Sequence, residues 1–310
     1  MREFQLQMID GKELTTYEWT DVKNPVAVIQ LVHGSAERAA RYDEFARRMN
    51  EQGIVVVAED HRGHGKTAIL ENQELGFFAK KDGWNIIVED LKVINAYIKR
   101  NWQGLPIFML GHSMGSFMAR TYACKYSETI SGLILSGTAE MPRLLINLAK
   151  NMSAIEMLFK GAKHPAKFIW NMSYKNLNKK WDSETSNGCE WQCQDPLVQG
   201  WFIDDKLCGQ VFSTSAFRDM FKGMLFNSKN KNIKYMRNDL PIIIISGEDD
   251  VVGQYGKTPE KLHNKLTSLG YDSELIIYPK LRHEILFELD KNLVEQDILK
   301  FINQNKQNHF

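Results

Sequence analysis

Short apolar runs alternate with amphipathic segments along most of this sequence, and the alternation sets the fold class. The apolar runs are rich in β-branched residues and have the length of buried strands, whereas the segments between them repeat their apolar residues with a helical period. Strands that alternate with helices form a mostly parallel sheet with helices on both faces. We therefore predict an α/β fold with strands at Val26–Val32, Ile54–Ala58, Ile107–Leu110, Ile130–Leu135, Ile242–Ile245 and Glu274–Ile277, and helices at Arg41–Gln52, Asp82–Arg100, Ser113–Lys125, Thr258–Leu269 and Lys291–Asn303.

The alternation is interrupted once, between Thr138 and about Asn238, by helical pieces and many loop residues. Because ligands of open α/β sheets bind at the carboxyl ends of the strands, we expect this insertion to form a cap over that edge. The chain then divides into a core of residues 1–137 and 239–310 and a helical cap of residues 138–238. Ahead of the first buried strand, the N-terminal residues predict a hairpin that turns at Asp10-Gly11.

The composition is that of an ordinary globular enzyme. The chain has 310 residues, 43% hydrophobic and 25% charged, and its net charge is only +1, so we expect no nucleic-acid partner. We find neither an apolar leader nor an apolar run near the ~18 residues of a membrane span, and we expect a cytoplasmic protein. The four cysteines are too few and scattered for a disulfide framework, and Cys189 and Cys193 lack a second ligand pair for a metal, so ordinary thiols are expected. The sequence carries no signal for the oligomeric state.

One segment has the pattern of a nucleophile turn: P-I-F-M-L-G-H-S-M-G-S-F-M-A-R, from Pro106 to Arg120. A serine stands between two glycines, directly after a predicted strand and directly before a predicted helix. Gly111 and Gly115 let the backbone turn sharply and let the helix pack close to the strand. The pattern G-x-S-x-G in this setting predicts that Ser113 is a nucleophile. The alternative is a tight turn with an inert serine.

A serine hydroxyl needs a base to take its proton and a third group to hold that base. In hydrolases with this turn, the acid and then the histidine follow the serine along the chain. Three histidines follow the cap. His263 lies within a predicted helix and His309 is next to the last residue, so His283, in the loop after a strand, is the predicted base.

Three carboxylates are candidates for the acid. The strand Ile242–Ile245 runs into S-G-E-D-D-V-V-G, which contains Glu248, Asp249 and Asp250. Position and chemistry alone do not separate the two aspartates, and a solvated acidic turn is the alternative for either of them.

The oxyanion of acyl transfer needs preorganised backbone donors, each worth ~3–4 kcal/mol. One expected donor is the amide of Met114, directly after the nucleophile. The other is the amide of Ser35, in the loop L-V-H-G-S-A-E after an early strand, where Gly34 lets the chain turn. The histidines of this loop and of D-H-R-G-H-G (Asp60–Gly65) would also suit a metal, but we favour hydrogen-bonded turn packing and expect no metal or organic cofactor.

Four motifs are spread through the chain: H-G-S-A-E-R-A-A-R-Y (His33–Tyr42), D-H-R-G-H-G, G-H-S-M-G (Gly111–Gly115), and G-E-D-D-V-V-G followed later by R-H-E. In this order they resemble the α/β-hydrolases, specifically the monoacylglycerol lipase and lysophospholipase branch of serine hydrolases. The resemblance covers nearly all of the chain outside the cap. G-x-S-x-G is shared by the whole superfamily, whereas the first motif is much more specific and resembles this branch in particular.

The resemblance implies Asp250 as the acid, because the family's acid lies three residues after the glycine that ends its strand. It implies His283 as the base and the amides of Ser35 and Met114 as the oxyanion donors. It also implies a serine carboxylester hydrolase that acts through an acyl-enzyme on monoacyl lipids (monoacylglycerol or lysophospholipid) or similar esters. The alternatives are an acyltransferase or a non-lipid esterase on the same scaffold, and a non-catalytic binding protein. The chain departs from the family at Arg38 and Ala40, where many members have histidine and glycine.

The first part of the cap is both basic and apolar. Between Arg143 and Lys180 there are eight Lys or Arg and a single acidic residue, Glu156. Basic amphipathic helices can lie on an anionic membrane surface. The alternative, which we favour, is a lid helix whose apolar face packs on the core while its lysines are solvated. In both cases apolar residues turn toward the site, so we expect an apolar acyl pocket beneath the cap.

Overall fold

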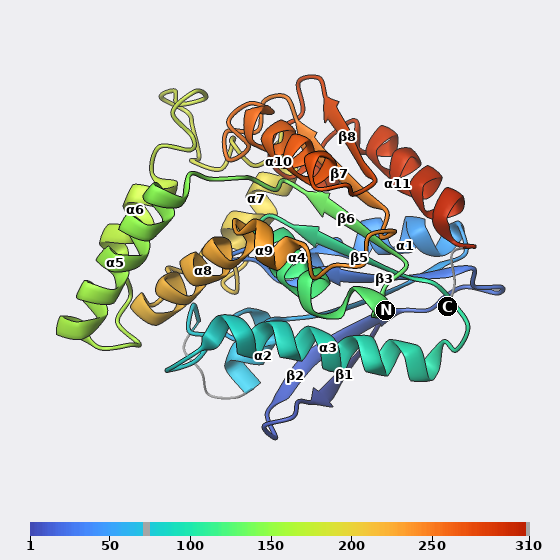
Figure 1. Ribbon diagram of the computed structural model, residues 1–310. Coiled ribbons are helices and arrows are strands. Elements are labelled where there is room, and N and C mark those ends of the chain that lie inside the picture. Colours follow the sequence, from blue (N-terminus) through green and yellow to red (C-terminus); the bar gives the residue numbers. More distant parts are fainter. Residues whose placement is uncertain (71–74, 308–310) are drawn as a thin grey trace.

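Eight strands form one sheet at the centre of the computed structural model, which describes residues 1–70 and 75–307 (Figure 1). The strand order is β1-β2-β4-β3-β5-β6-β7-β8. β1 and β2 form the predicted hairpin and β2 pairs antiparallel with β4, whereas all other neighbours pair parallel. The bounds are β1 Arg2–Gln7, β2 Glu13–Trp19, β3 Ala27–Val32, β4 Ile54–Glu59, β5 Ile107–His112, β6 Gly132–Ser136, β7 Ile242–Gly247 and β8 Ser273–Tyr278.

Side chains of the parallel strands pack alternately into two separate apolar clusters, one on each face of the sheet. In β5, Ile107 and Met109 belong to one cluster, and Phe108 and Leu110 belong to the other. Both faces of the sheet are therefore covered, which is why these strands read as continuous apolar runs in the sequence.

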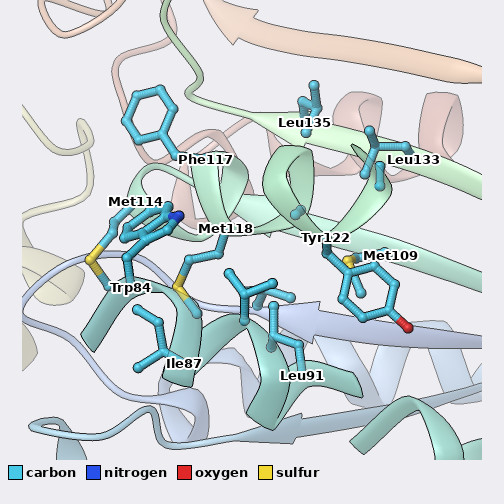
Figure 2. Close-up of a cluster of buried hydrophobic side chains, with 14 of the residues drawn as sticks. Trp84, Ile87, Leu91, Met109, Met114, Phe117, Met118, Tyr122, Leu133 and Leu135 are labelled. Atoms are coloured by element: carbon cyan, nitrogen blue, oxygen red, sulfur yellow. The ribbon is translucent and has the colours of Figure 1, made fainter. Parts of the chain in front are cut away.

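Helices cover the two faces as the sequence predicts. The ends of these helices lie no more than two residues from the predicted ends. One face carries α1 (Asp43–Glu51) and α11 (Lys291–Asn305). The other carries α3 (Gly83–Asn101), α4 (Met114–Tyr126) and α10 (Lys257–Ser268). Figure 2 shows part of this second cluster, where side chains of α3 and α4 meet β5 and β6. The short elements outside the cap are α2 (Gly65–Leu70), η1 (Ala39–Tyr42), η2 (Ser127–Thr129) and η3 (Ile285–Phe287). The predicted α/β architecture is confirmed.

The insertion lies between β6 and β7, which are neighbours in the sheet. It contains α5 (Arg143–Lys160), α6 (Lys167–Tyr174), α7 (Pro196–Asp204), α8 (Thr214–Asn227) and α9 (Asn230–Ile233). Figure 1 shows α5 and α6 beyond the arrowhead ends of β5 and β6. α8 packs against α5 and also against α3 and α4 of the core. The division into a cap of residues 138–238 and a core of residues 1–137 and 239–310 stays our proposal.

Candidate active site

Ser113 lies on a sharp turn between β5 and α4. Its backbone has φ 51° and ψ −119°, a strained conformation for a residue other than glycine. Close packing requires the two flanking glycines. A Cβ at Gly111 would lie 2.5 Å from the carbonyl oxygen of Gly115, and a Cβ at Gly115 would lie 2.1 Å from the carbonyl oxygen of Val32. The start of α4 therefore rests directly on the end of β3.

The hydroxyl of Ser113 contacts an imidazole that in turn contacts a carboxylate. Ser113 Oγ lies 3.0 Å from His283 Nε2, and His283 Nδ1 lies 2.9 Å from Asp250 Oδ1. Asp250 and His283 are buried, and Ser113 is partly exposed. Asp250 also accepts hydrogen bonds from the amide of Val252 at 2.8 Å and the hydroxyl of Ser246 at 3.3 Å. This arrangement can move a proton from the hydroxyl to the imidazole while the carboxylate faces the imidazolium that forms.

The other two carboxylates after β7 have different partners. Asp249 forms a surface ion pair with Lys180 of the cap insertion at 2.5 Å. Glu248 is exposed and accepts a hydrogen bond from the amide of Lys280 at 3.2 Å. The structure thus brings Asp250 to the imidazole and keeps its two neighbours at the surface.

Burial and charge act in opposite directions on the buried pair. Burial acts to lower the pKa of His283, but the carboxylate of Asp250 outweighs it and raises that pKa above the 6.5 of a free imidazole. Burial acts to raise the pKa of Asp250, and the imidazole and backbone amides lower it below its ordinary value. The pair therefore consists of an ionised carboxylate and a basic imidazole.

We expect the acid limb of the pH profile of kcat/KM to have its midpoint above pH 6.5. His283 must be neutral to take a proton, and its raised pKa means that the neutral form is lost as the pH falls through that higher value. Two other buried histidines near the site do not titrate in this range, because burial lowers the pKa of His64 and His112 to about 3. The measurement is kcat/KM for an uncharged ester from about pH 5 to about pH 9. An acid midpoint below 6.5 would mean that the carboxylate of Asp250 does not outweigh burial in setting the pKa of His283.

The two amides predicted to hold the oxyanion adjoin Ser113. Met114 is the first residue of α4, and the first amides of a helix have no partner within the helix. The loop of Gly34 and Ser35 lies against Ser113, since a Cβ at Gly34 would lie 3.2 Å from Ser113 Cβ. The residues that carry the two predicted amides therefore lie next to Ser113 in the structure, and the role of these amides in binding an oxyanion stays a prediction.

A buried ion cluster joins the Ser35 loop to the His283 loop. Glu37 accepts hydrogen bonds from the amide of Gly34 at 2.5 Å and from the hydroxyl of Tyr42 at 2.9 Å. Arg41 donates to Glu37 at 2.6 Å and to both carboxylate oxygens of Glu284 at 3.0 and 2.8 Å. Arg41 thus ties the two loops through a bidentate pair. Sequence reasoning missed this role, although the spacing of Glu37 and Arg41 within the first motif was a visible signal.

Two cavities meet at Ser113. The first, of about 390 Å³, is lined mainly by apolar residues of α4, α5, α6 and α8, among them Met114, Phe117, Leu145, Ile146, Leu148, Ala149, Met172, Met220, Phe221 and Met224. The second has a similar volume of about 390 Å³ and a more polar lining that includes Glu37, Asn171, Lys175, Asn178, Asp182, Gln192 and Glu284. Ser35, Ser113 and His283 line both cavities. The cavity on one side of Ser113 therefore suits an apolar chain, and the cavity on the other side suits a polar group.

Two aromatic residues from the cap insertion line both cavities. The hydroxyl of Tyr174 lies 2.8 Å from Ser35 Oγ, and the Tyr174 ring stacks on Trp170 at 4.1 Å between centroids. The ring centroid of Trp191 lies 5.3 Å from that of His283. No short motif marks Tyr174 or Trp191 in the sequence, and only the fold brings them to the site.

The remaining candidates take no part in the contacts among Ser113, His283 and Asp250. His263 lies on α10 and hydrogen-bonds Ser273 at 3.2 Å, and His309 lies outside the described residues. All four cysteines are free, and burial raises the pKa of Cys189 to about 11. Within residues 1–70 and 75–307, no cluster of three or more His, Cys, Asp or Glu side chains could hold a metal. In the same ranges, none of the helices combines the length and the apolar character that crossing a bilayer requires.

The departure at Arg38 also has a structural explanation. Arg38 Nε donates to Asp205 Oδ2 at 2.6 Å, just after α7. This residue therefore links the loop after β3 to the cap insertion.

Three comparisons with known proteins bear on this site. The family model described as serine aminopeptidase, S33 matches residues 23–290. A monoacylglycerol lipase of Mycolicibacterium smegmatis is 25% identical over 296 residues, which cover 95% of this chain and 94% of that protein. A thermostable carboxyl esterase from Bacillus coagulans, solved in complex with glycerol, superimposes with a TM-score of 0.88 at 28% identity over 98% of both chains. A monoglyceride lipase from Saccharomyces cerevisiae, solved with a substrate analog, has a TM-score of 0.76 at 22% identity over 98% of this chain and 95% of that chain, and shows the shared fold.

Proposed function

The chain belongs to the serine aminopeptidase S33 family of α/β-hydrolases and is a carboxylic ester hydrolase, and from this premise we propose that it hydrolyses monoacyl lipids through Ser113, His283 and Asp250. The observation that carries the proposal is the apolar cavity of about 390 Å³ that ends at the Ser113 hydroxyl. A cavity of this kind fits one acyl chain, whereas the polar cavity beside it fits the alcohol. Relatives named for monoacylglycerol hydrolysis support the same substrate class.

In the first half of the proposed reaction, Ser113 Oγ attacks the ester carbonyl carbon while His283 Nε2 takes its proton. The amides of Ser35 and Met114 donate to the oxyanion, and Asp250 stabilises the imidazolium. When the tetrahedral intermediate collapses, His283 returns the proton to the leaving alcohol oxygen, and the acyl group stays on Ser113 as an ester.

In the second half, His283 takes a proton from a water molecule as that water attacks the acyl-enzyme. Collapse of the second tetrahedral intermediate breaks the bond to Ser113 Oγ, which recovers the proton, and the fatty acid leaves. No step in this scheme needs a metal or an organic cofactor. In an acyltransferase a second alcohol would replace water, so the products (fatty acid or new ester) distinguish the two activities.

We expect kcat/KM for monoacylglycerols to rise with acyl-chain length. Burial of one CH₂ contributes about 0.8 kcal/mol, so four added methylenes in the apolar cavity would raise kcat/KM on the order of a hundredfold. The measurement is a series of 1-monoacylglycerols and lysophospholipids from acetyl to oleoyl. The matched variant is Ala149→Trp, which narrows the cavity on α5 and should lower turnover of long chains but not of acetyl esters. Activity confined to acetyl esters would contradict the lipid assignment.

We further propose that the outer face of α5 and α6 contacts an anionic membrane for short periods. Leu144, Leu158, Phe159 and Phe168 are 60% to 85% exposed on these helices. The stretch from Arg143 to Lys180, which includes both helices, carries eight Lys or Arg and one acidic residue. Leu145, Leu148 and Met172 are about half exposed and also line the apolar cavity, so the outer apolar surface continues into it. This continuity supports a path for a lipid from the bilayer to Ser113.

We expect the protein to sediment with vesicles that contain phosphatidylserine and to bind less well to neutral vesicles or in high salt. A triple variant with Leu144→Ser, Phe159→Ser and Phe168→Ser should partition at least about tenfold more weakly, since each side chain loses apolar burial in the bilayer. The control is Leu289→Ser with Leu293→Ser, two exposed leucines outside the insertion. Equal binding by all three proteins would exclude this surface as the docking face.

For the compartment we keep the cytoplasm as our proposal. The free state of all four cysteines supports it, because thiols persist in a reducing environment.

A further inference from the structure

His33 directly follows β3, at the start of the loop that carries the Ser35 amide, and its side chain is fully buried. Its Nδ1 lies 2.8 Å from the carbonyl oxygen of Gly34. Its Nε2 accepts a hydrogen bond from the amide of His61 at 3.1 Å. The proposed reaction gives this side chain no role, and the bonds on its two nitrogens define what it does.

The two contacts fix the tautomer of His33. Nε2 faces an N–H donor and must therefore carry a lone pair, so the ring proton is on Nδ1 and is donated to the Gly34 carbonyl. Burial, together with the neighbouring rings of His61 and His64, holds the pKa of His33 well below its ordinary value. The ring therefore stays neutral, with one donor and one acceptor, through the pH range of ester hydrolysis.

The carbonyl of Gly34 and the amide of Ser35 belong to the same peptide unit. A trans peptide is planar, and its C=O and N–H point in opposite directions. A hydrogen bond that fixes the carbonyl therefore also fixes the direction of the amide. On the preceding peptide, Glu37 holds the Gly34 amide at 2.5 Å. The carbonyl of Gly34 is thus held by His33 and its amide by Glu37, and both of these side chains are buried.

His33 is itself held in place by the ring of His61. The two rings stack with centroids 3.7 Å apart and an interplanar angle of 20°. His61 Nε2 lies 3.1 Å from the carbonyl oxygen of His33, and its Nδ1 lies 2.8 Å from Glu59 at the end of β4. A chain of contacts thus runs from β4 through two imidazoles to the loop beside Ser113.

We propose that His33 is a positioning residue that aims the Ser35 amide at the oxyanion. The inference rests on the proposed function, because it names the side chain that orients the Ser35 amide, one of the two oxyanion donors in that reaction. Oxyanion donors act only when their direction is set before the charge develops. Loss of the Nδ1 bond should therefore lower kcat and leave KM nearly unchanged.

The test uses two replacements that each keep one half of the imidazole. In His33→Asn the side-chain amide can occupy the Nδ1 position and donate to Gly34, whereas in His33→Gln the side-chain oxygen can occupy the Nε2 position and the donor is lost. We expect His33→Gln to lower kcat by roughly 10²-fold, the loss typical of one oxyanion donor. His33→Asn should recover at least about tenfold of that loss, and affinity for an alkyl boronic acid, which mimics the tetrahedral state, should follow kcat in both variants.

The matched control is His64→Gln. His64 is a buried member of the same group of rings, but its Nδ1 contacts the carbonyl of Arg62 and not the oxyanion loop. We expect it to keep kcat within about twofold of the unmodified protein. Equal losses of kcat in His33→Gln and His64→Gln, or an unchanged kcat in His33→Gln, would overturn the inference.

A measurement on the unmodified protein covers the case in which the variants fail to fold. Nitrogen NMR of the histidine rings should show the proton of His33 on Nδ1, and a proton on Nε2 would overturn the inference without any variant. Failure of the proposed function has a different signature, which is ester turnover that survives in Ser113→Ala.

Discussion

Replacement of Ser113 by alanine is expected to lower kcat for ester hydrolysis by about 10⁴-fold to 10⁶-fold. The hydroxyl lies 3.0 Å from His283 Nε2 and is the atom that forms the acyl-enzyme in the proposed reaction. Without it, the imidazole has no nucleophile to deprotonate, and only the oxyanion amides and substrate binding remain. Alanine adopts the strained φ of 51° no less readily than serine does, so the fold should be kept.

The readouts for Ser113→Ala are steady-state turnover of a p-nitrophenyl ester and the thermal midpoint of unfolding. We expect a midpoint within about 2 °C of the unmodified protein, because the change removes one partly exposed hydroxyl. Turnover within tenfold of the unmodified protein would mean that another residue attacks the ester, and Ser113 would lose its assignment.

Replacement of Asp250 by asparagine is expected to lower kcat by about 10⁴-fold. The carboxylate accepts the Nδ1–H of His283 at 2.9 Å, which leaves Nε2 free to take the proton of Ser113. An asparagine can present its NH₂ to Nδ1 and so favour the wrong tautomer, in which Nε2 is protonated and cannot act as a base. It also removes the charge that raises the pKa of His283.

The matched control for Asp250→Asn is Asp249→Asn, one residue away. Asp249 pairs with Lys180 at the surface, and exposed ion pairs are worth only about 0–1 kcal/mol. We expect its kcat to stay within about twofold. A large loss in Asp249→Asn together with little change in Asp250→Asn would reverse the assignment of the acid.

The fold follows from the sequence because its parallel strands are buried on both faces. Runs such as Ile242–Ile245 have apolar residues at every position, and their side chains enter two clusters on opposite faces. The alternation with helices then leaves few arrangements, since parallel neighbours need a crossover between them. The observed strands begin and end within two residues of the predicted ones.

Part of the candidate site is also encoded within a short stretch of sequence. The turn at Ser113 depends on glycines two residues away on each side, so its geometry is encoded within one short segment. Glu248, Asp249 and Asp250 all carry a carboxylate, and they differ in where their side chains point. The sequence alone therefore could not separate them. Only the family resemblance preferred Asp250, and the turn after β7 brings that side chain to His283.

The remaining features depend on segments that are distant in the sequence. Arg41 reaches Glu284 across 243 positions, and the cap residues Tyr174 and Trp191 come to the site from an insertion without a recognisable motif. The packing of α8 on α3 and α4 was likewise not predicted, because an amphipathic helix does not show which partner its apolar face will meet.

The most direct test of the account is to identify the residue that a fluorophosphonate modifies. The probe forms a covalent bond with a serine only where a base activates the hydroxyl and donors hold the phosphonyl oxygen. The protein would be labelled to completion, digested and sequenced by mass spectrometry, with ester turnover followed in parallel. We predict one adduct per chain, on Ser113, formed at the same rate as turnover is lost. An adduct on any other residue, or full labelling with turnover intact, would contradict the proposal that Ser113 is the nucleophile.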